Sequence, residues 1–164
     1  MALKDVLLAE YDHEMGVTRR LLERVPDAQL SWKPHDKSMS LGALATHIAS
    51  LPEWGGLILN EAAFDLGGGP PSVVPCGSRT EILERFDQAS SRTRAAIDKT
   101  DAELTARWTL TRGDHEMFSL PRATAFLSFV LNHVIHHRGQ LSVYLRLNNV
   151  PVPAIYGPSA DEGL

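Results

Sequence analysis

The sequence is poor in cysteine, with only Cys76 among its 164 residues. One cysteine cannot form an internal disulfide, so nothing here indicates a disulfide-stabilised secreted domain. Cys76 lies in a loop rich in proline and glycine, outside the expected helices, and is a poor candidate for a metal ligand or a nucleophile. No apolar run approaches the roughly 20 residues that a membrane-spanning helix needs. The N-terminal segment also lacks the apolar stretch and cleavage site of a signal peptide, so we expect a cytoplasmic protein with no membrane partner.

Positive charge is also sparse, since 16 lysines and arginines stand against 20 acidic residues and give a formal net charge of −4. A nucleic-acid-binding protein usually carries a basic stripe, so we do not expect nucleic acid as a partner. The chain length falls within the usual size of one domain and suffices to bury one core. We therefore expect a single domain over residues 1–164.

Helical periodicity is present in four stretches, about 3–25, 40–64, 78–99 and 121–147. Ser40 is placed as an N-cap of the second stretch, and Ser78 with Glu81 fits a capping box at the start of the third. Pro52 lies inside the second stretch and should kink or divide that helix. The run from Gly67 to Pro71 ends any helix before it.

A short β-hairpin is expected between the third and fourth helices. Residues 108–111 and 116–119 have strand character and flank the turn sequence Arg112-Gly113-Asp114. The fourth helix is expected to begin near Pro121, a residue favoured at a first helical position. The predicted fold is therefore all-α, a four-helix bundle with a minor β-hairpin between helices 3 and 4.

Three of the seven histidines fall on apolar helix faces. His133 and His137 are four residues apart, so they are neighbours on the inward face of the fourth helix. A buried polar ring without partners costs about 1–3 kcal/mol, so the pair is either hydrogen-bonded within the core or bound to a metal ion. His47 lies between Leu44 and Leu51 on the apolar face of the second helix. If the two helices face each other, the three histidines supply the ligands of an open divalent metal site.

The remaining polar residues near this face have more than one interpretation. His136 lies on the flank, so we interpret it as a packing or hydrogen-bonding residue rather than a ligand. Gln140, three residues beyond His137, either hydrogen-bonds a bound water or ligand or packs against a neighbouring helix. Glu14 either accepts a hydrogen bond from a ligand imidazole or is an ordinary rim carboxylate. Gln140 and Glu14 are thus the candidates for a catalytic role. Arg138 projects away from the inward face of the fourth helix, so we expect it to form a salt bridge.

Other histidines and two tryptophans have simpler interpretations. His13, His35 and His115 lie in polar surroundings and are expected on the surface. Trp32 and Trp54 are more typical of a core than of a substrate platform. The sequence has no HExxH motif and no ExxH pair, which disfavours a helical zinc protease and a di-iron bundle.

The segment from Asn132 to Leu141 (NHVIHHRGQL) strongly resembles the fourth-helix motif of the DinB-like family of damage-inducible proteins. The segment from Lys37 to Ala49 resembles the second-helix motif of that family, and the tail from Pro151 to Ser159 is similar to its endings. The resemblance spans the whole chain. It implies a four-helix bundle in which His47, His133 and His137 hold a divalent metal ion, usually nickel or zinc, and it implies a homodimer.

The resemblance also implies a class of reaction, because some members of the wider family activate a low-molecular-weight thiol and attach it to an electrophile. We therefore expect a metal-dependent thiol S-transferase acting on a small-molecule substrate. Three neutral imidazoles leave the +2 charge of an ion uncompensated, which makes a bound water more acidic and deprotonates a bound thiol. Two alternatives stay open: a metal-dependent hydrolase that uses bound water, and a non-catalytic metal-binding protein of a stress response.

Overall fold

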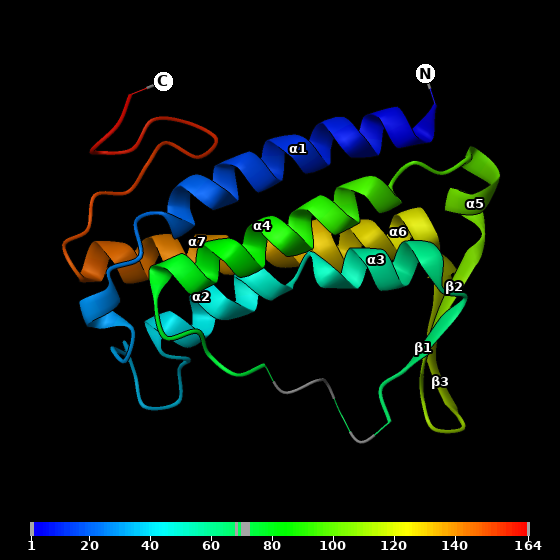
Figure 1. The fold of residues 1–164 in the computed structure, drawn as a ribbon, viewed down its shortest axis with the longest axis horizontal. Coiled ribbons are helices and arrows are strands. Elements are labelled where there is room, and N and C mark those ends of the chain that lie inside the picture. The colour runs from blue at the N-terminus through cyan, green and yellow to red at the C-terminus, as the bar shows by residue number, and fades with distance from the viewer. Residues whose placement is uncertain (1, 68, 70–72, 164) are drawn as a thin grey trace.

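The structure is a computed structural model that describes residues 2–67, 69 and 73–163. It is mostly helical with one small three-stranded sheet. Figure 1 shows the long helices packed lengthwise against one another, with the sheet at one end. The helical elements are α1 (Leu3–Leu22), η1 (Asp27–Gln29), α2 (Leu41–Ser50), α3 (Glu53–Asn60), α4 (Arg79–Ala96), α5 (Asp101–Thr105), α6 (Arg122–Phe126), the π-helical segment η2 (Leu127–Leu131) and α7 (Asn132–Leu147). The strands are β1 (Ala63–Asp65), β2 (Arg107–Arg112) and β3 (His115–Pro121).

The described chain has more helices than the four that the sequence predicted. The second predicted helix is divided into α2 and α3, and the fourth is composed of α6, η2 and α7. Helix α5 was not predicted. Helix α3 ends at Asn60, earlier than expected, because the chain turns there into strand β1. The run from Gly67 to Pro71 therefore does not end this helix, and its residues Gly68, Pro70 and Pro71 lie outside the described residues.

Pro52 divides the second helix by removing one backbone donor. Without an amide N–H at position 52, the Ile48 carbonyl has no i+4 donor, and the Leu51 N–H instead contacts both His47 O (3.1 Å) and Ile48 O (3.3 Å). The Pro52 carbonyl accepts a hydrogen bond from the Thr93 hydroxyl of α4. The break is thus stabilised within the core, and the last turn of α2 carries His47.

The helix starts follow the predicted caps with one difference. The Ser40 hydroxyl accepts from the Ala43 N–H (3.1 Å), which confirms its role at the start of α2. The Ser78 hydroxyl accepts from the Glu81 N–H (3.2 Å), as a capping box requires. The Glu81 carboxylate, however, accepts from the Gly77 N–H (2.8 Å) and not from Ser78. Only the serine half of the predicted box is therefore confirmed.

The predicted hairpin is confirmed and extended. Strands β2 and β3 pair antiparallel, and their turn contains Gly113 at φ +58°, a conformation that favours glycine. Pro121 ends β3 and caps α6, so the helix begins one residue later than expected. Strand β1 adds to β2 in parallel, with Phe64 opposite Leu110. A strand of three residues carries too little alternation to be found in a sequence, so β1 was missed.

The core lies between the long helices and continues under the sheet. Its largest buried side chains include Tyr11 of α1, Phe86 of α4, Trp108 of β2 and Phe126 of α6. Across the described residues, no helix combines the length and the apolarity that crossing a membrane would require.

Candidate metal centre

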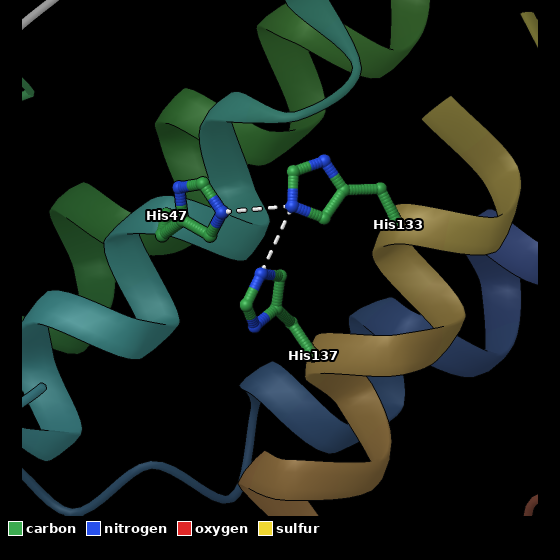
Figure 2. Close-up of side chains that lie close together, drawn as sticks. All are labelled: His47, His133 and His137. Carbon is green, nitrogen blue, oxygen red and sulfur yellow. Dashed lines mark hydrogen bonds between the residues drawn. The ribbon is translucent and has the colours of Figure 1, made fainter. Parts of the chain in front are cut away.

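The three predicted histidines meet between α2 and α7, which pack against each other. Figure 2 shows the His47 ring on α2 facing His133 and His137 on α7. The Nε2 atom of His133 lies 3.4 Å from Nε2 of His47 and 3.0 Å from Nε2 of His137. One donor atom from each ring lies within 4.8 Å of the other two. Together these atoms could hold one metal ion.

The protons of the rings alone cannot satisfy this arrangement. A neutral imidazole nitrogen offers either one N–H or one lone pair, yet Nε2 of His133 faces two other Nε2 atoms. Nε2 of His133 can therefore form a hydrogen bond with only one of these two atoms. The Nε2 atom of the remaining histidine is left without a hydrogen-bond partner at His133. Tetrahedral zinc holds its imidazole nitrogens at about 2.0–2.1 Å, which separates two ligand nitrogens by about 3.3 Å. The two spacings at His133 Nε2, 3.4 and 3.0 Å, are close to that value, and all three donor atoms lie within 4.8 Å of one another, so the residues fit a divalent ion.

Metal ligation requires neutral imidazoles, and burial shifts the pKa of all three rings downward, in the direction that favours the neutral form. Burial, with smaller effects from His137 and His133, lowers the pKa of His47 to about 4. Burial also lowers the pKa of His133, and the neighbouring His137 acts in the same direction. The pKa of His137 is lowered by burial, although its hydrogen bond with Gln140 acts in the opposite direction.

Gln140 contacts one of the candidate ligands directly. Its Oε1 lies 2.7 Å from Nδ1 of His137, and its Nε2 lies 3.1 Å from Nε2 of His136. With Nδ1–H of His137 donating to the amide oxygen, the Nε2 lone pair of that ring points toward the other two histidines. Gln140 therefore positions a candidate ligand. His136 is exposed and lies outside the three-histidine cluster, in agreement with its predicted flanking position.

Glu14 has a different role from the two that the sequence suggested. It is not a rim carboxylate, since only 1% of it is exposed. Its Oε2 forms an ion pair with Nη1 of Arg138 (2.6 Å), and its Oε1 accepts a hydrogen bond from the Tyr156 hydroxyl (2.7 Å). Arg138 does form the predicted salt bridge. Arg138 faces α1, whereas its neighbour His137 faces α2. Within the described residues, the Glu14 carboxylate therefore pairs with Arg138 and Tyr156 and not with the three histidines.

An apolar cavity of about 320 Å³ opens beside the histidines. His47 and His133 form part of its wall, and most of the rest is aliphatic or aromatic. Its large side chains are Trp54, Leu57, Trp108, Leu110 and Phe129. Trp54 therefore lines a cavity, contrary to its interpretation as a core residue. Nothing in the sequence pattern marked Trp108 or Phe129 as cavity residues, because the cavity wall combines α2, α3, η2 and β2.

Residues 1–163 match the DinB family. The chain belongs to the DinB family. Within this fold, a DinB-like protein from Bacillus cereus ATCC 10987 has a TM-score of 0.71 at 24% identity, covering 91% of this chain and 95% of that one. The DinB-like protein YjoA from Bacillus subtilis has a TM-score of 0.64 at 20% identity, covering 88% and 94%.

A sequence relative of this DinB-family chain is YrdA of Bacillus subtilis (strain 168), described as an uncharacterized protein. It is 26% identical over 160 residues, which cover 96% of this chain and 90% of YrdA. The predicted family is therefore confirmed. The metal, the thiol and the homodimer implied by the resemblance stay predictions, as does the cytoplasmic location expected from the N-terminal sequence.

The other residues singled out in the sequence lie away from the histidine cluster. His13, His35 and His115 are exposed, as predicted. Trp32 packs edge-on against Tyr144, with ring centroids 5.5 Å apart. Cys76 is half-buried, and its backbone N–H donates to Thr46 Oγ1 (2.9 Å). The described cluster of possible ligands does not include Cys76.

Proposed function

We propose that this DinB-family chain is a metal-dependent enzyme that joins a low-molecular-weight thiol to an electrophilic carbon of a small, largely apolar substrate. The observation that carries the proposal is the convergence of three neutral imidazoles at the edge of an apolar cavity. Neutral donors leave the charge of a divalent ion uncompensated, and an apolar wall strengthens the effect of that charge.

His47, His133 and His137 would hold the ion, with zinc or nickel as the proposed metal because imidazole suits both. Such an ion supplies Lewis acidity, which lowers the pKa of a bound thiol and so makes thiolate available at neutral pH. Gln140 keeps the His137 ring turned toward the site through its 2.7 Å contact. In this proposal the three histidines hold the ion, and Gln140 orients one of them.

In the proposed transfer, the thiol would release its proton to solvent, and its sulfur would form a bond to the electrophilic carbon. The leaving group would depart with the electron pair of the bond that breaks. The cavity contributes by binding the apolar part of the electrophile and excluding water from it. Trp54 offers a flat surface for this, and Phe129 lies on the same wall one turn before His133. Excluding water also disfavours hydrolysis of the electrophile, which competes with the transfer.

One observation favours a second candidate function, a metal-dependent hydrolase. Such an enzyme needs a general base near the ion, and the sequence suggested only Glu14 for this role. The ion pair of Glu14 with Arg138 removes that candidate. Glu53, however, lines the same cavity as His47 and His133, so a carboxylate is available at its rim. Glu53 is exposed, and its carboxylate lies 3.6 Å from the Arg92 guanidinium.

An optical titration of the cobalt-substituted protein with cellular thiols tests the proposal. Glutathione, bacillithiol and mycothiol would each be added to protein shown to hold one cobalt ion. We expect a new near-ultraviolet sulfur-to-metal charge-transfer band with at least one thiol. His133→Ala is the control for the site, because it should bind neither cobalt nor thiol, whereas His35→Ala should behave as wild type.

If no thiol produced such a band, the transferase proposal would be wrong. The remaining candidates would be a metal-dependent hydrolase and a non-catalytic metal site. Circular dichroism of the metal-free protein separates these two. We expect the metal-free protein to stay folded, because the apolar side chains of its long helices are already buried in a common core. Cooperative unfolding upon metal removal would instead indicate an ion that holds the helices together.

A further inference from the structure

A second, polar groove lies beside the apolar cavity. It has a volume of about 520 Å³ and is bounded by α4, the start of α3 and the loop at residues 74–76. Figure 1 shows α4 running along α2 and α3, which are also the helices that form much of the cavity. Glu53 lines both hollows, so they adjoin at this residue. A ligand that occupied both hollows would pass Glu53.

Arg85 links the two hollows from the side of α4. Arg85 lines the groove, and its Nη1 donates to the hydroxyl of Ser50 (3.3 Å). Ser50 lines the apolar cavity and lies one helical turn after His47. Arg85 is half-buried and forms no ion pair with any described residue, whereas Arg94 on the same helix binds Asp12 through two nitrogens at 2.8 Å. The remaining donors of Arg85 are thus available to a carboxylate.

The groove carries charges of both signs. Arg92 lies 3.6 Å from Glu53, and both side chains are at least half exposed, so this ion pair is weak and a ligand can replace it. Glu81 and Glu84 also line the groove, and the Glu81 carboxylate is already bound to the Gly77 N–H. A purely anionic ligand would be repelled by these carboxylates. A ligand with both a carboxylate and an ammonium group matches the charged side chains of the groove better.

We propose that this groove binds the charged part of an amino-acid-containing thiol, whose sulfur reaches the three histidines. Arg85 binds a carboxylate of the thiol, and Glu53 binds its ammonium group. The apolar cavity remains for the electrophile. The inference rests on the proposed function, since it names the class of thiol that the same site takes.

The test measures thiol dissociation constants by optical titration of the cobalt-substituted protein. Glutathione is the probe with both charges. Its diethyl ester lacks the carboxylates, N-acetylglutathione lacks the ammonium group, and 2-mercaptoethanol reports sulfur coordination alone. We expect glutathione to bind about tenfold or more tightly than its diethyl ester, the usual size of a charge-assisted contact. N-acetylation should weaken binding by a smaller factor, because Glu53 is exposed.

Arg85→Gln should weaken glutathione binding about tenfold while leaving 2-mercaptoethanol unchanged. Arg85→Lys keeps the charge and should recover part of the loss. Arg94→Gln is the matched control on the same helix, and it should change neither constant because Arg94 pairs with Asp12 outside the groove. Unchanged 2-mercaptoethanol binding also shows that each variant keeps a folded site.

Two results would overturn the inference in distinguishable ways. If 2-mercaptoethanol coordinates cobalt but glutathione and its ester bind equally, or Arg85→Gln has no effect, the groove proposal is wrong and the proposed function stands. If no thiol coordinates, including 2-mercaptoethanol, the proposed function is wrong and the groove proposal fails with it.

Discussion

Two polar clusters lie on different faces of α7, and the adjacent residues His137 and Arg138 belong to one cluster each. His137 faces α2 and meets His47 and His133, while Arg138 faces α1 and meets Glu14. In the α1 cluster, opposite charges are paired at 2.6 Å and the Tyr156 hydroxyl bridges Arg138 and Glu14 at 2.6 and 2.7 Å. In the histidine cluster, three neutral nitrogens face one another without enough donors.

The difference separates a structural cluster from a functional one. Buried polar groups that satisfy each other hold elements together and leave nothing for a ligand. Here the Arg138 network ties α7 to α1 and to the C-terminal tail through Tyr156. Buried groups that converge with unused lone pairs are instead prepared for a cation. Four predictions test this division, from the largest expected effect to the smallest.

His133→Ala should abolish stoichiometric binding of a divalent metal, because it removes the nitrogen that lies nearest to both other candidate ligands. Metal content per protein, measured after dialysis by atomic emission, checks this. His136→Ala is the matched control on the next turn and should keep one ion per chain. Wild-type affinity in His133→Ala would show that the site lies elsewhere.

Glu14→Gln should lower the free energy of unfolding by about 3–5 kcal/mol, because the Arg138 guanidinium would stay buried without a counter-charge. Urea denaturation followed by circular dichroism measures it. Asp12→Asn is the control on the same helix: it breaks an exposed pair with Arg94, which contributes about 0–1 kcal/mol. Equal losses in the two variants would contradict the structural role of the α1 cluster.

Gln140→Ala should weaken metal binding about 10- to 100-fold and leave the fold intact, since Gln140 orients the His137 ring from outside the cluster. Competition with a chromophoric chelator gives the affinity. Gln140→Glu should recover most of it, because a carboxylate accepts from Nδ1–H as the amide does. An unchanged affinity in Gln140→Ala would show that His137 needs no orienting partner.

The metal-free protein should lose stability as the pH falls from 6.5 to about 5. In this range the histidines of the unfolded chain take up protons, whereas His47, with its pKa lowered to about 4, stays neutral in the folded chain. The unfolded state then binds more protons and is favoured. Because His47 is half-exposed, we expect a change of only about 1 kcal/mol. The melting temperature measured against pH checks this. It should change less with pH in His47→Gln than in the wild-type protein, and an equal change in the two proteins would contradict the role of His47.

Much of this organisation could be predicted from the sequence because it depends on periodicity. Spacings of three and four placed His133 and His137 on one face of a helix, and Pro52 marked where the second helix divides. Residue types at turns predicted the hairpin around Gly113. The three-residue strand β1 and the π-helical segment η2 carry no such signal, and both were missed.

The sequence by itself determined which residues lie on which helix face, because that depends only on local geometry. Only the tertiary structure decided which faces meet. It paired Glu14 with Arg138, removing Glu14 from the histidine site, and it brought Trp54, Trp108 and Phe129 from three elements around one cavity. It also placed Arg85 beside Ser50. Such contacts join residues far apart in the chain, and the packing angles that create them leave no periodic trace in the sequence.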